Sequence, residues 1–399
     1  MALDFQQVYT RIKEIGAHAR ERRRTLEERQ EKARGLLNNY ADALQALRDK
    51  VETAKRADPN LRCAVPLLER LDARVAPQPD LPANTVLIAA DGSQINPDRH
   101  GVAQFGLINV GAISLRLHSG ESPQVFTESQ LLFDADLLTP SGLPLTEGMV
   151  ALQRDLQERT RLENIAAQFD ESTLVVTFTD GPIELWGAHE GPDAGAYEHS
   201  MAAYLAVLSR LQSRGVITAG YVDKPAADLV LRLLELTLAT AEDLRRLREF
   251  RPLLGVSDRW LFGDKENPLL GPGERSAVFR IQTRAEKFYK GALSLHFFYL
   301  NVGTQGHPWP VRVEIPRWVA DDPAKLGLLH AVLVSQCQVM GSRPYPYLLH
   351  RAHETALVSH QERAQVEGML LQELRHAGEE PDEGSYKQSA KDLPGRTRR

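Results

Sequence analysis

The sequence predicts an α/β protein whose sheet mixes antiparallel and parallel strands, with flanking helices and a helical N-terminal arm. Three strand-like runs follow one another over 85–91, 103–117 and 123–133 with short turn-rich separators, which favours an antiparallel meander. A continuous apolar, β-branched run at 172–180 has the pattern of a buried central strand. A further strand-like run at 216–223 follows after a helical segment. Strands alternating with helices predict parallel pairing through crossovers.

The N-terminal arm is expected to cover residues 1–75, and residues 2–57 have a helical pattern. Apolar side chains recur at spacings of three and four, at Phe5, Val8, Ile12 and Ile15 and again at Leu37, Tyr40, Leu44, Leu47 and Val51. This heptad-like stripe is compatible with a hairpin that packs on its own domain and equally with a surface for a second copy or a partner. The proline-rich segment "VAPQPDLPAN" at 75–84 is expected to end the arm.

The main domain is predicted to span 85–376, with a loop-rich insertion at about 251–276. Thr146 is an N-cap candidate for the first helix after the meander, and Gly215 is a stop signal for the second. The tail at 377–399 lacks apolar content and is expected to be disordered. The other expected elements are helices at 145–169, 195–215, 225–250, 322–341 and 345–377, and paired strands at 293–303 and 309–319.

Composition excludes several classes of protein. The net charge of −5 over 399 residues means that any site for a polyanion must be a local basic patch. The two cysteines, Cys63 and Cys337, argue against a disulfide framework or a cysteine zinc site and suit a reducing compartment. No signal-peptide pattern or bilayer-length apolar stretch is present. The expected location is therefore cytoplasmic, with no membrane partner.

Three antiparallel strands followed by parallel strands with helical crossovers is the plan of an RNase H-like sheet. In that plan, carboxylates of the first strand, the first helix and the fourth strand converge. The first strand run ends in Asp91 and the fourth in Asp180, and a glycine follows each. One such Asp-Gly pair is usually only a turn, but two at equivalent strand ends favour a site. Their oxygen ligands suit Mg²⁺ or Mn²⁺ rather than zinc.

The helix at 145–169 offers two candidates for the third carboxylate. Glu158 lies in "QRDLQERT", and Glu163 follows five residues later. On an α-helix these two side chains point about 140° apart, so that only one can face the site. Most carboxylates on a charged helix are simply solvated, and the choice between the two remains open on sequence grounds.

Five segments together resemble the NurA family of DNA-end-processing nucleases, over about residues 85–360. They read "AADGSQINPDRHGVAQFGLINVG", "RDLQE", "TDGPIELW", "GYVDKP" and "YPYLLHRAHETAL". The resemblance implies an RNase H-like fold, a homodimer, a need for Mn²⁺ or Mg²⁺, and single-strand endonuclease and 5′-to-3′ exonuclease activity. It also implies cooperation with the hexameric HerA helicase/translocase in the resection of double-strand breaks. ATP hydrolysis would belong to that partner, since the loop "GPGERS" lacks the spacing and lysine of a P-loop.

By position, the family's metal-site residues correspond to Asp91, Glu158, Asp180 and His353. The sequence departs from the family where it has Asp-Gly-Pro in place of the commoner Asp-Gly-Ser. The resemblance implies two divalent ions about 4 Å apart, bridged by Asp91, for phosphodiester hydrolysis. His353 would be a metal ligand or a proton carrier. Without the resemblance, a histidine on an amphipathic helix is more often an ordinary surface or core residue.

Side chains that would hold DNA are predicted from their charge or their rings. Cations near the motifs would contact phosphates, and aromatic rings would stack on unpaired bases. The cations are Arg99, Lys224, Arg284 and Lys287, and the aromatic residues are Trp186, Phe288 and Tyr289. The sequence thus predicts a metal-dependent deoxyribonuclease. The alternatives are a non-catalytic adaptor of a DNA translocase and an RNase H-like nuclease that acts on RNA.

Overall fold

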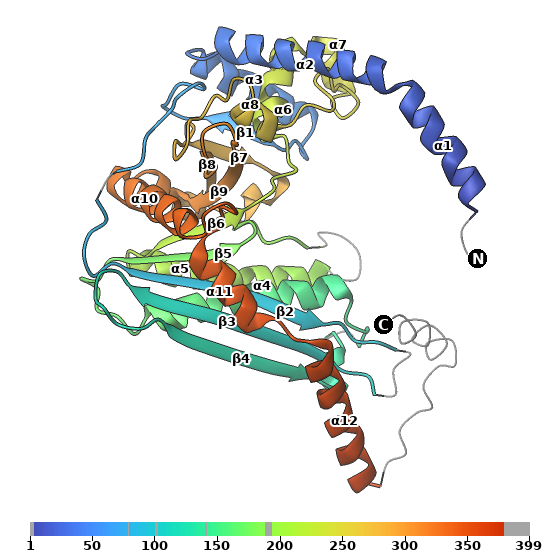
Figure 1. The fold of residues 1–399 in the computed structure, drawn as a ribbon, viewed down its shortest axis with the longest axis vertical. Helices are drawn as coiled ribbons and strands as arrows, with labels where there is room; N and C mark the ends of the chain where they lie inside the picture. The colour runs from blue at the N-terminus through green and yellow to red at the C-terminus, as the bar shows by residue number, and fades with distance from the viewer. Residues whose placement is uncertain (1–3, 79, 100–102, 140–141, 188–193, 379–399) are drawn as a thin grey trace. The chain divides into compact units, whose positions relative to one another are not determined.

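The computed structural model describes residues 4–78, 80–99, 103–139, 142–187 and 194–378. Figure 1 shows the order of the elements along the chain. The chain divides into two compact units. Unit 1 comprises Met1–Gln78 and Val222–Ala320, and unit 2 comprises Pro79–Tyr221 and Asp321–Arg399. Within the described ranges, no helix has both the length and the apolar character needed to cross a membrane.

The strands of unit 2 follow the predicted plan. They are β2 (Val86–Ile95), β3 (Gly106–Arg116), β4 (Gln124–Leu132), β5 (Val175–Asp180) and β6 (Ile217–Val222). Their spatial order is β4-β3-β2-β5-β6. β2, β3 and β4 pair antiparallel, whereas β5 pairs parallel with both β2 and β6. The predicted RNase H-like mixed sheet is therefore confirmed.

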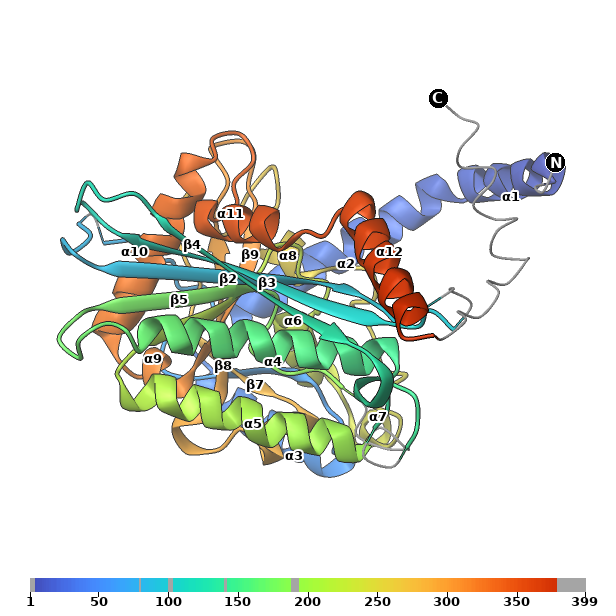
Figure 2. The same cartoon turned by 90° about the horizontal axis from the view of Figure 1, so that it is seen from below.

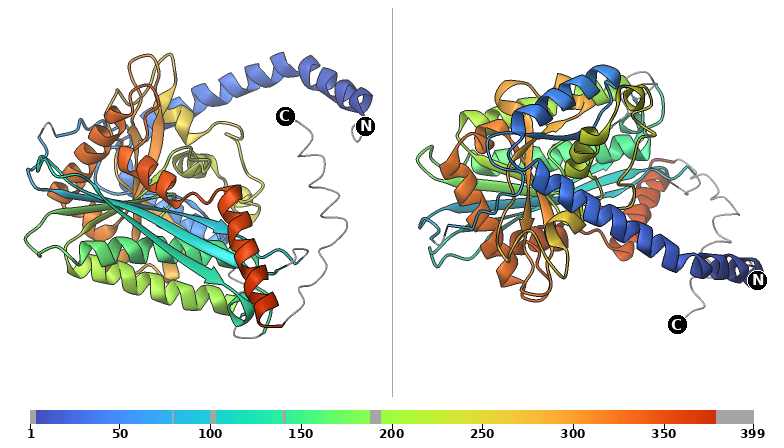
Figure 3. Two further views of the ribbon diagram at one scale, coloured as in Figure 1. Left: turned by 60° about the horizontal axis from the view of Figure 1, so that its bottom comes forward. Right: turned by 90° about the horizontal axis from the view of Figure 1, so that it is seen from above.

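Helices cover both faces of this sheet. α4 (Glu147–Ala166) and α5 (Ala194–Ser213) pack together on one face, and α11 (Tyr347–Ala356) crosses β2 and β3 on the other (Figure 2; Figure 3, left). The Thr146 hydroxyl accepts a hydrogen bond from the backbone N–H of Met149, and so it caps α4 as predicted. These helices bury the sheet from both sides, which explains the continuous apolar pattern of β5.

The segment predicted as one helix at 345–377 is two helices, α11 and α12 (His360–His376). Leu357 adopts an extended conformation after α11. Ser359 then starts α12 with a capping box, in which its hydroxyl accepts from the N–H of Glu362 and the Glu362 carboxylate accepts from the N–H of Ser359. The preceding helix of unit 2, α10 (Pro323–Val339), begins at Asp322, whose side chain caps it.

A buried arginine fixes α4 against the parallel strands. Arg159 is only 1% exposed. Its Nη2 donates to the Thr179 hydroxyl on β5 at 2.7 Å, and its Nη1 donates to the Thr218 hydroxyl on β6 at 3.0 Å. Because a buried guanidinium without partners would be costly, these bonds hold α4 at a defined height over the strands. The adjacent residue on that helix is Glu158.

Unit 1 contains β1 (Cys63–Pro66), β7 (Phe279–Gln282), β8 (Leu295–Asn301) and β9 (Pro310–Pro316). They pair antiparallel in the order β1-β7-β8-β9. β8 and β9 are the predicted strand pair. β1 and β7 were not predicted, because four-residue strands carry too little alternation. The helices of this unit are α1 (Phe5–Ala17), α2 (Ala19–Asn39), α3 (Leu44–Ala57), α6 (Leu229–Leu238), α7 (Ala241–Arg245), α8 (Asp258–Gly263) and α9 (Arg317–Ala320).

The N-terminal helices differ from the predicted separate arm. The second half of α2 and all of α3 belong to the core of unit 1, and Leu37, Leu47 and Val51 are at most 2% exposed. These helices pack against α6, α8 and β1. The second half of the heptad-like stripe, from Leu37 to Val51, is thus covered by its own unit, whereas the first half on α1 is exposed. Of the three helices α1, α2 and α3, it is α1 that has no buried residue. The predicted disordered tail lies outside the described residues from 379 onward.

Candidate active site around Asp91

Asp91 lies within a strand and not at its end. β2 continues through Asp91 and Gly92 to Ile95, and Asp91 pairs with Gly111 on β3. On the other side, the pairing of β2 with β5 stops at Ala90 and Thr179. The prediction that Gly92 turns the chain away is therefore wrong. Asp91 instead marks the point where β2 separates from β5 while it stays paired with β3.

Two glycines allow helices to approach Asp91 from both faces. A Cβ on Gly92 would lie 2.7 Å from Glu158 Oε1 and 2.7 Å from Arg154 Cγ, both on α4. A Cβ on Gly111 would lie 2.6 Å from the backbone oxygen of Ala352 and 2.6 Å from the backbone nitrogen of Ala356, both on α11. At such distances a Cβ fits only if the neighbouring atom moves. At Gly111 the close atoms are backbone, so the glycine opposite Asp91 is required by helix packing, whereas at Gly92 they belong to flexible side chains of α4 that can move aside.

α11 brings His353 to Asp91. The Nδ1 atom of His353 lies 2.6 Å from Oδ2 of Asp91, and the imidazole remains exposed. The C-terminal end of α11 is fixed to the sheet through the carbonyl of Ala356. This oxygen accepts from the hydroxyl of Ser93 on β2 and from the side-chain amide of Asn109 on β3. The helix is therefore held at both strands that flank the carboxylate.

α4 contributes two carboxylates at the opposite face. Glu158 is 5% exposed, and Asp155 lies one turn before it. Arg154 bridges them, with Nη2 at 2.8 Å from Asp155 Oδ1 and Nε at 3.3 Å from Glu158 Oε1. Sequence reasoning missed Asp155, although its spacing of three residues from Glu158 places both on one helical face.

The carboxylates of Asp91, Asp155 and Glu158 influence one another's ionisation. Burial raises the pKa of Glu158 well above its usual value, and the neighbouring charges of Asp155 and Asp91 raise it further, against the opposing effect of Arg154. Burial also raises the pKa of Asp155, and the charge of Asp91 again acts in the same direction. Like charges held in a partly desolvated place are costly unless a cation joins them. Strongly raised carboxylate pKa values in such a cluster are typical of functional sites.

Asp180 stands at the true end of β5. Its Oδ1 accepts from the N–H of Gly181 at 3.0 Å, and Gly181 has a φ of +89°, which favours glycine. The predicted Asp-Gly turn is present here. Because Ala90 pairs with Thr179, Asp91 and Asp180 are the next residues on two adjacent parallel strands. Asp91 makes the same local bond, with Oδ1 accepting from the N–H of Gly92 at 2.9 Å.

Glu163 has a different partner. Its Oε2 lies 3.1 Å from Nε of Arg210 on α5, and its side chain is 10% exposed. This ion pair joins the two helices beneath the sheet. The geometry of α4 therefore favours Glu158 over Glu163 as the helix carboxylate of the site.

Comparison with known proteins identifies the family. The model of the NurA domain matches residues 85–358, which is more than half of the chain. The chain belongs to the NurA family. The structure of the NurA nuclease from Sulfolobus solfataricus is similar to this chain with a TM-score of 0.52 at 10% identity, over 93% of this chain and 98% of that one. At this identity, the likeness establishes the NurA fold alone.

More distant structures are also similar. The catalytic domain of human Endonuclease V matches with a TM-score of 0.31 at 13% identity, over 82% of this chain and 98% of that one. This score is too low to support an argument about function. No curated protein matches the sequence at a significant level.

The residues of this NurA chain fit a divalent cation by their chemistry. As the side chains stand, no three His, Cys, Asp or Glu residues in the described ranges are grouped closely enough to hold a metal ion. The donors available around Asp91 are carboxylate oxygens and one imidazole, which suit Mg²⁺ or Mn²⁺.

The predicted DNA-contacting residues of this NurA chain are distributed over both units. Arg99 is exposed in unit 2, in the turn after β2, whereas Lys224, Arg284 and Lys287 are exposed in unit 1. Lys287 Nζ lies 4.7 Å from the centroid of the Phe288 ring. Tyr289 is 1% exposed. Its prediction as a base-stacking residue is therefore wrong, because its ring is part of the core of unit 1.

The two aromatic residues named beside Tyr289 are more accessible. Trp186 is 56% exposed and Phe288 is half-buried. Lys224 stands near a further ring that the sequence did not single out, with Nζ 5.6 Å from the centroid of Trp309. Arg259 lies over the same ring at 4.5 Å. Such cation–π contacts orient the two positive side chains.

Proposed function

We propose that this NurA-family protein is a metal-dependent deoxyribonuclease that hydrolyses phosphodiester bonds in single strands and at DNA ends. The observation that carries the proposal is the contact of His353 with Asp91 on one face of the sheet, together with Glu158 and Asp155 on α4 at the other face, where the charge of Asp91 raises the pKa of both. Asp180 stands next to Asp91 on the neighbouring strand. A negative cluster of this kind has no evident structural purpose, since ionised carboxylates close together destabilise a fold.

Asp91, Asp180 and Glu158 would hold Mn²⁺ or Mg²⁺, with Asp155 as a further oxygen donor. A bound divalent ion makes water a better nucleophile and stabilises the charge of the leaving oxygen. Asp91 fixes the imidazole ring through Nδ1, which leaves Nε2 of His353 available to hold or pass a proton. Arg154 balances part of the negative charge on α4.

The finer activities are proposed from the family resemblance: single-strand endonuclease and 5′-to-3′ exonuclease action in the resection of double-strand breaks, with a HerA-type translocase. The protein would act as a homodimer. The stripe on α1 supports an assembly role for that helix, because Phe5, Val8, Ile12 and Ile15 are between 40% and 65% exposed. A helix with one uncovered apolar face commonly packs against another chain.

One experiment tests the activity and its rivals. Purified protein is incubated with end-labelled single-stranded DNA, with Mn²⁺ or Mg²⁺ and in parallel with excess chelator. The proposal expects cleavage with metal and none with chelator. Binding of DNA without cleavage under all metals would favour an adaptor role. An RNA oligonucleotide of the same sequence is the matched substrate, and faster cleavage of RNA would favour a ribonuclease.

A further inference from the structure

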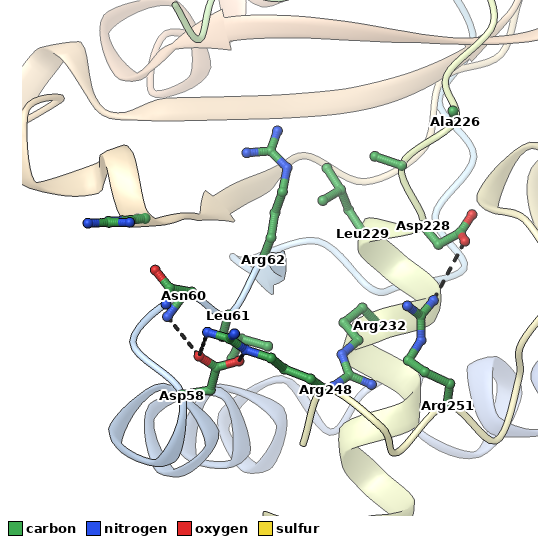
Figure 4. Close-up of a pocket in the computed structure, with 12 residues that line it drawn as sticks. Asp58, Asn60, Leu61, Arg62, Ala226, Asp228, Leu229, Arg232, Arg248 and Arg251 are labelled. Atoms are coloured by element: carbon green, nitrogen blue, oxygen red, sulfur yellow. Dashed lines mark hydrogen bonds and ion pairs between the residues drawn. The ribbon is translucent and has the colours of Figure 1, made fainter. Parts of the chain in front are cut away.

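Unit 1 contains an arginine-lined pocket of about 700 Å³ that is separate in sequence from the carboxylate site (Figure 4). Residues 58–62, which join α3 to β1, form one side, and residues 226–229, at the start of α6, form another. We call this the arginine pocket. Its five arginines are Arg62, Arg232, Arg248, Arg251 and Arg284.

The charge of the arginine pocket is positive after its internal ion pairs are counted. Two carboxylates, Asp58 and Asp228, are among the lining residues. A third, Glu235, contacts Arg232 and Arg251 from behind the pocket wall. Five guanidinium groups against three carboxylates leave a net charge of about two positive. In a chain with a net charge of −5, such a concentration stands out as a local anion-binding feature.

Several of these guanidinium groups are held in place before any ligand arrives. Arg232 is buried and donates to Glu235 at 2.7 Å and to the backbone oxygen of Phe250 at 2.6 Å. Arg251 bonds Glu235 at 3.1 Å. Arg62 donates to the hydroxyl of Thr283 at 3.2 Å. Fixed side chains lose little conformational entropy on binding, so the pocket is preorganised.

Arg248 lies at the pocket, but its contacts there add little to the stability of the fold. It is 71% exposed, and it reaches Asp58 at 3.3 Å, as Figure 4 shows. An ion pair with so exposed a member contributes little to the stability of the fold. Arg284, which also lines the pocket, is exposed as well. Arg248 and Arg284 are accessible beside fixed arginines, and guanidinium groups bind phosphate oxygens through pairs of N–H donors.

We propose that the arginine pocket binds phosphate groups of a DNA strand, as an anchoring subsite outside the carboxylate site. This inference rests on the proposed nuclease function for the identity of the strand. The loop that lines the pocket continues directly from β6, where Tyr221 is the register partner of Asp180. Only four residues separate Tyr221 from Ala226, so a short piece of chain links the two sites in sequence.

The test compares two variants that remove equal charge. Arg248→Gln/Arg284→Gln removes the two accessible arginines of the pocket. Arg245→Gln/Arg246→Gln removes two exposed arginines that precede Arg248 in the chain and do not line the pocket. Anisotropy of a 3′-labelled single-stranded oligonucleotide is measured in excess chelator, so that no cleavage occurs, over a range of salt. Thermal melting verifies folding, and Arg248→Gln alone replaces the pair if the double variant is unfolded.

The pocket variant is expected to bind DNA roughly tenfold more weakly than the control variant, and its log–log salt slope should be smaller by about one to one and a half. An equal loss for 5′-phosphorylated and 5′-hydroxyl oligonucleotides supports the strand backbone as the ligand. A loss confined to the phosphorylated strand supports a terminal phosphate. Unchanged DNA binding together with lost binding of a nucleoside monophosphate and inorganic phosphate supports a free-phosphate site instead.

The proposal is overturned if pocket and control variants bind DNA alike, whether or not the binding of nucleoside monophosphate and phosphate changes. Since binding is measured in chelator, this result does not depend on whether the protein cleaves. Cleavage by the wild-type protein with Mn²⁺ is assayed separately. Absence of cleavage would refute the nuclease proposal and leave the phosphate measurement standing, so the two failures are distinguishable.

Discussion

Nδ1 of His353 lies 2.6 Å from Oδ2 of Asp91, although 262 residues separate them in the chain. The contact exists because Gly111, the cross-strand partner of Asp91, has no side chain where the backbone of α11 passes. Strand register and helix approach together therefore place an imidazole on the central carboxylate. The site is built by packing around one strand position.

Replacing Asp91 or Asp180 by asparagine should abolish cleavage. Each change removes an anionic ligand and keeps the shape of the side chain, so that metal binding weakens while the fold is kept. Cleavage of labelled single-stranded DNA under saturating Mn²⁺ measures the effect, with circular dichroism as the folding control. Near wild-type cleavage by either variant would show that its carboxylate is not a ligand.

Gly111→Ala should damage the site from a distance. The new Cβ would lie 2.6 Å from backbone atoms of α11, and backbone cannot move aside as a flexible side chain can. We expect a loss of about 1–3 kcal/mol in the free energy of unfolding and reduced cleavage, because His353 is displaced from Asp91. Urea unfolding and nuclease assays measure both quantities. If both the free energy of unfolding and the cleavage rate stay at wild-type values, α11 accommodates the new Cβ and its close approach to Gly111 is not needed.

Glu158→Gln and Glu163→Gln form a matched pair on α4. The first should be inactive, because it removes the buried carboxylate that α4 offers as a metal ligand. The second should remain active and lose only the ion pair with Arg210, at a cost on the order of 1 kcal/mol. Asp155→Asn, assayed in parallel, should lower the cleavage rate at a given concentration of Mn²⁺. The opposite pattern of the first two variants would assign the role to Glu163.

Asp258 should make the stability of unit 1 depend on pH. Its carboxylate accepts from the N–H groups of Val230 and Leu231 and from the hydroxyl of Tyr299. Burial raises its pKa to about 6. The folded state then holds this proton more tightly than the unfolded chain, so the stabilisation is complete below about pH 4 and is lost as the pH rises through 6.

The full shift corresponds to about 3 kcal/mol, of which about 2 kcal/mol should be lost from the free energy of unfolding between about pH 4.5 and 7. Asp258→Asn removes the titration and should flatten that part of the profile, although it also weakens the cap of α6. Urea midpoints of both proteins over this pH range provide the measurement. Parallel profiles for wild type and variant would contradict the assignment.

Deletion of residues 2–17 should leave the fold intact and weaken assembly. α1 has no buried residue, whereas Leu47 and Val51 further along are fully buried. A deletion of residues 2–57 should therefore unfold unit 1 and is unsuitable as an assembly test. Light scattering and a pull-down with the translocase measure the shorter deletion, with cleavage of short single strands as the activity control. Normal dimerisation and normal binding would refute an assembly role for α1.

The sequence by itself determined the strand plan and the two aspartates. Local periodicity predicts alternating strands and crossover helices, because it depends on residues only a few positions apart. The helix cap at Thr146 and the turn at Gly181 could be predicted for the same reason, since a cap and a positive-φ turn are local features. The Asp-Gly pairs singled out Asp91 and Asp180 as candidate ligands, and their role as ligands stays a prediction.

Only the tertiary structure decided what surrounds those aspartates. Gly92 is a strand residue that makes room for α4, and its sequence context alone indicated a turn. The burial of Tyr289, the packing of α3 into unit 1 and the gathering of five arginines around one pocket likewise depend on segments far apart in the chain. The local periodicity of a sequence does not predict which distant segment covers a side chain, because burial depends on long-range packing and strand register.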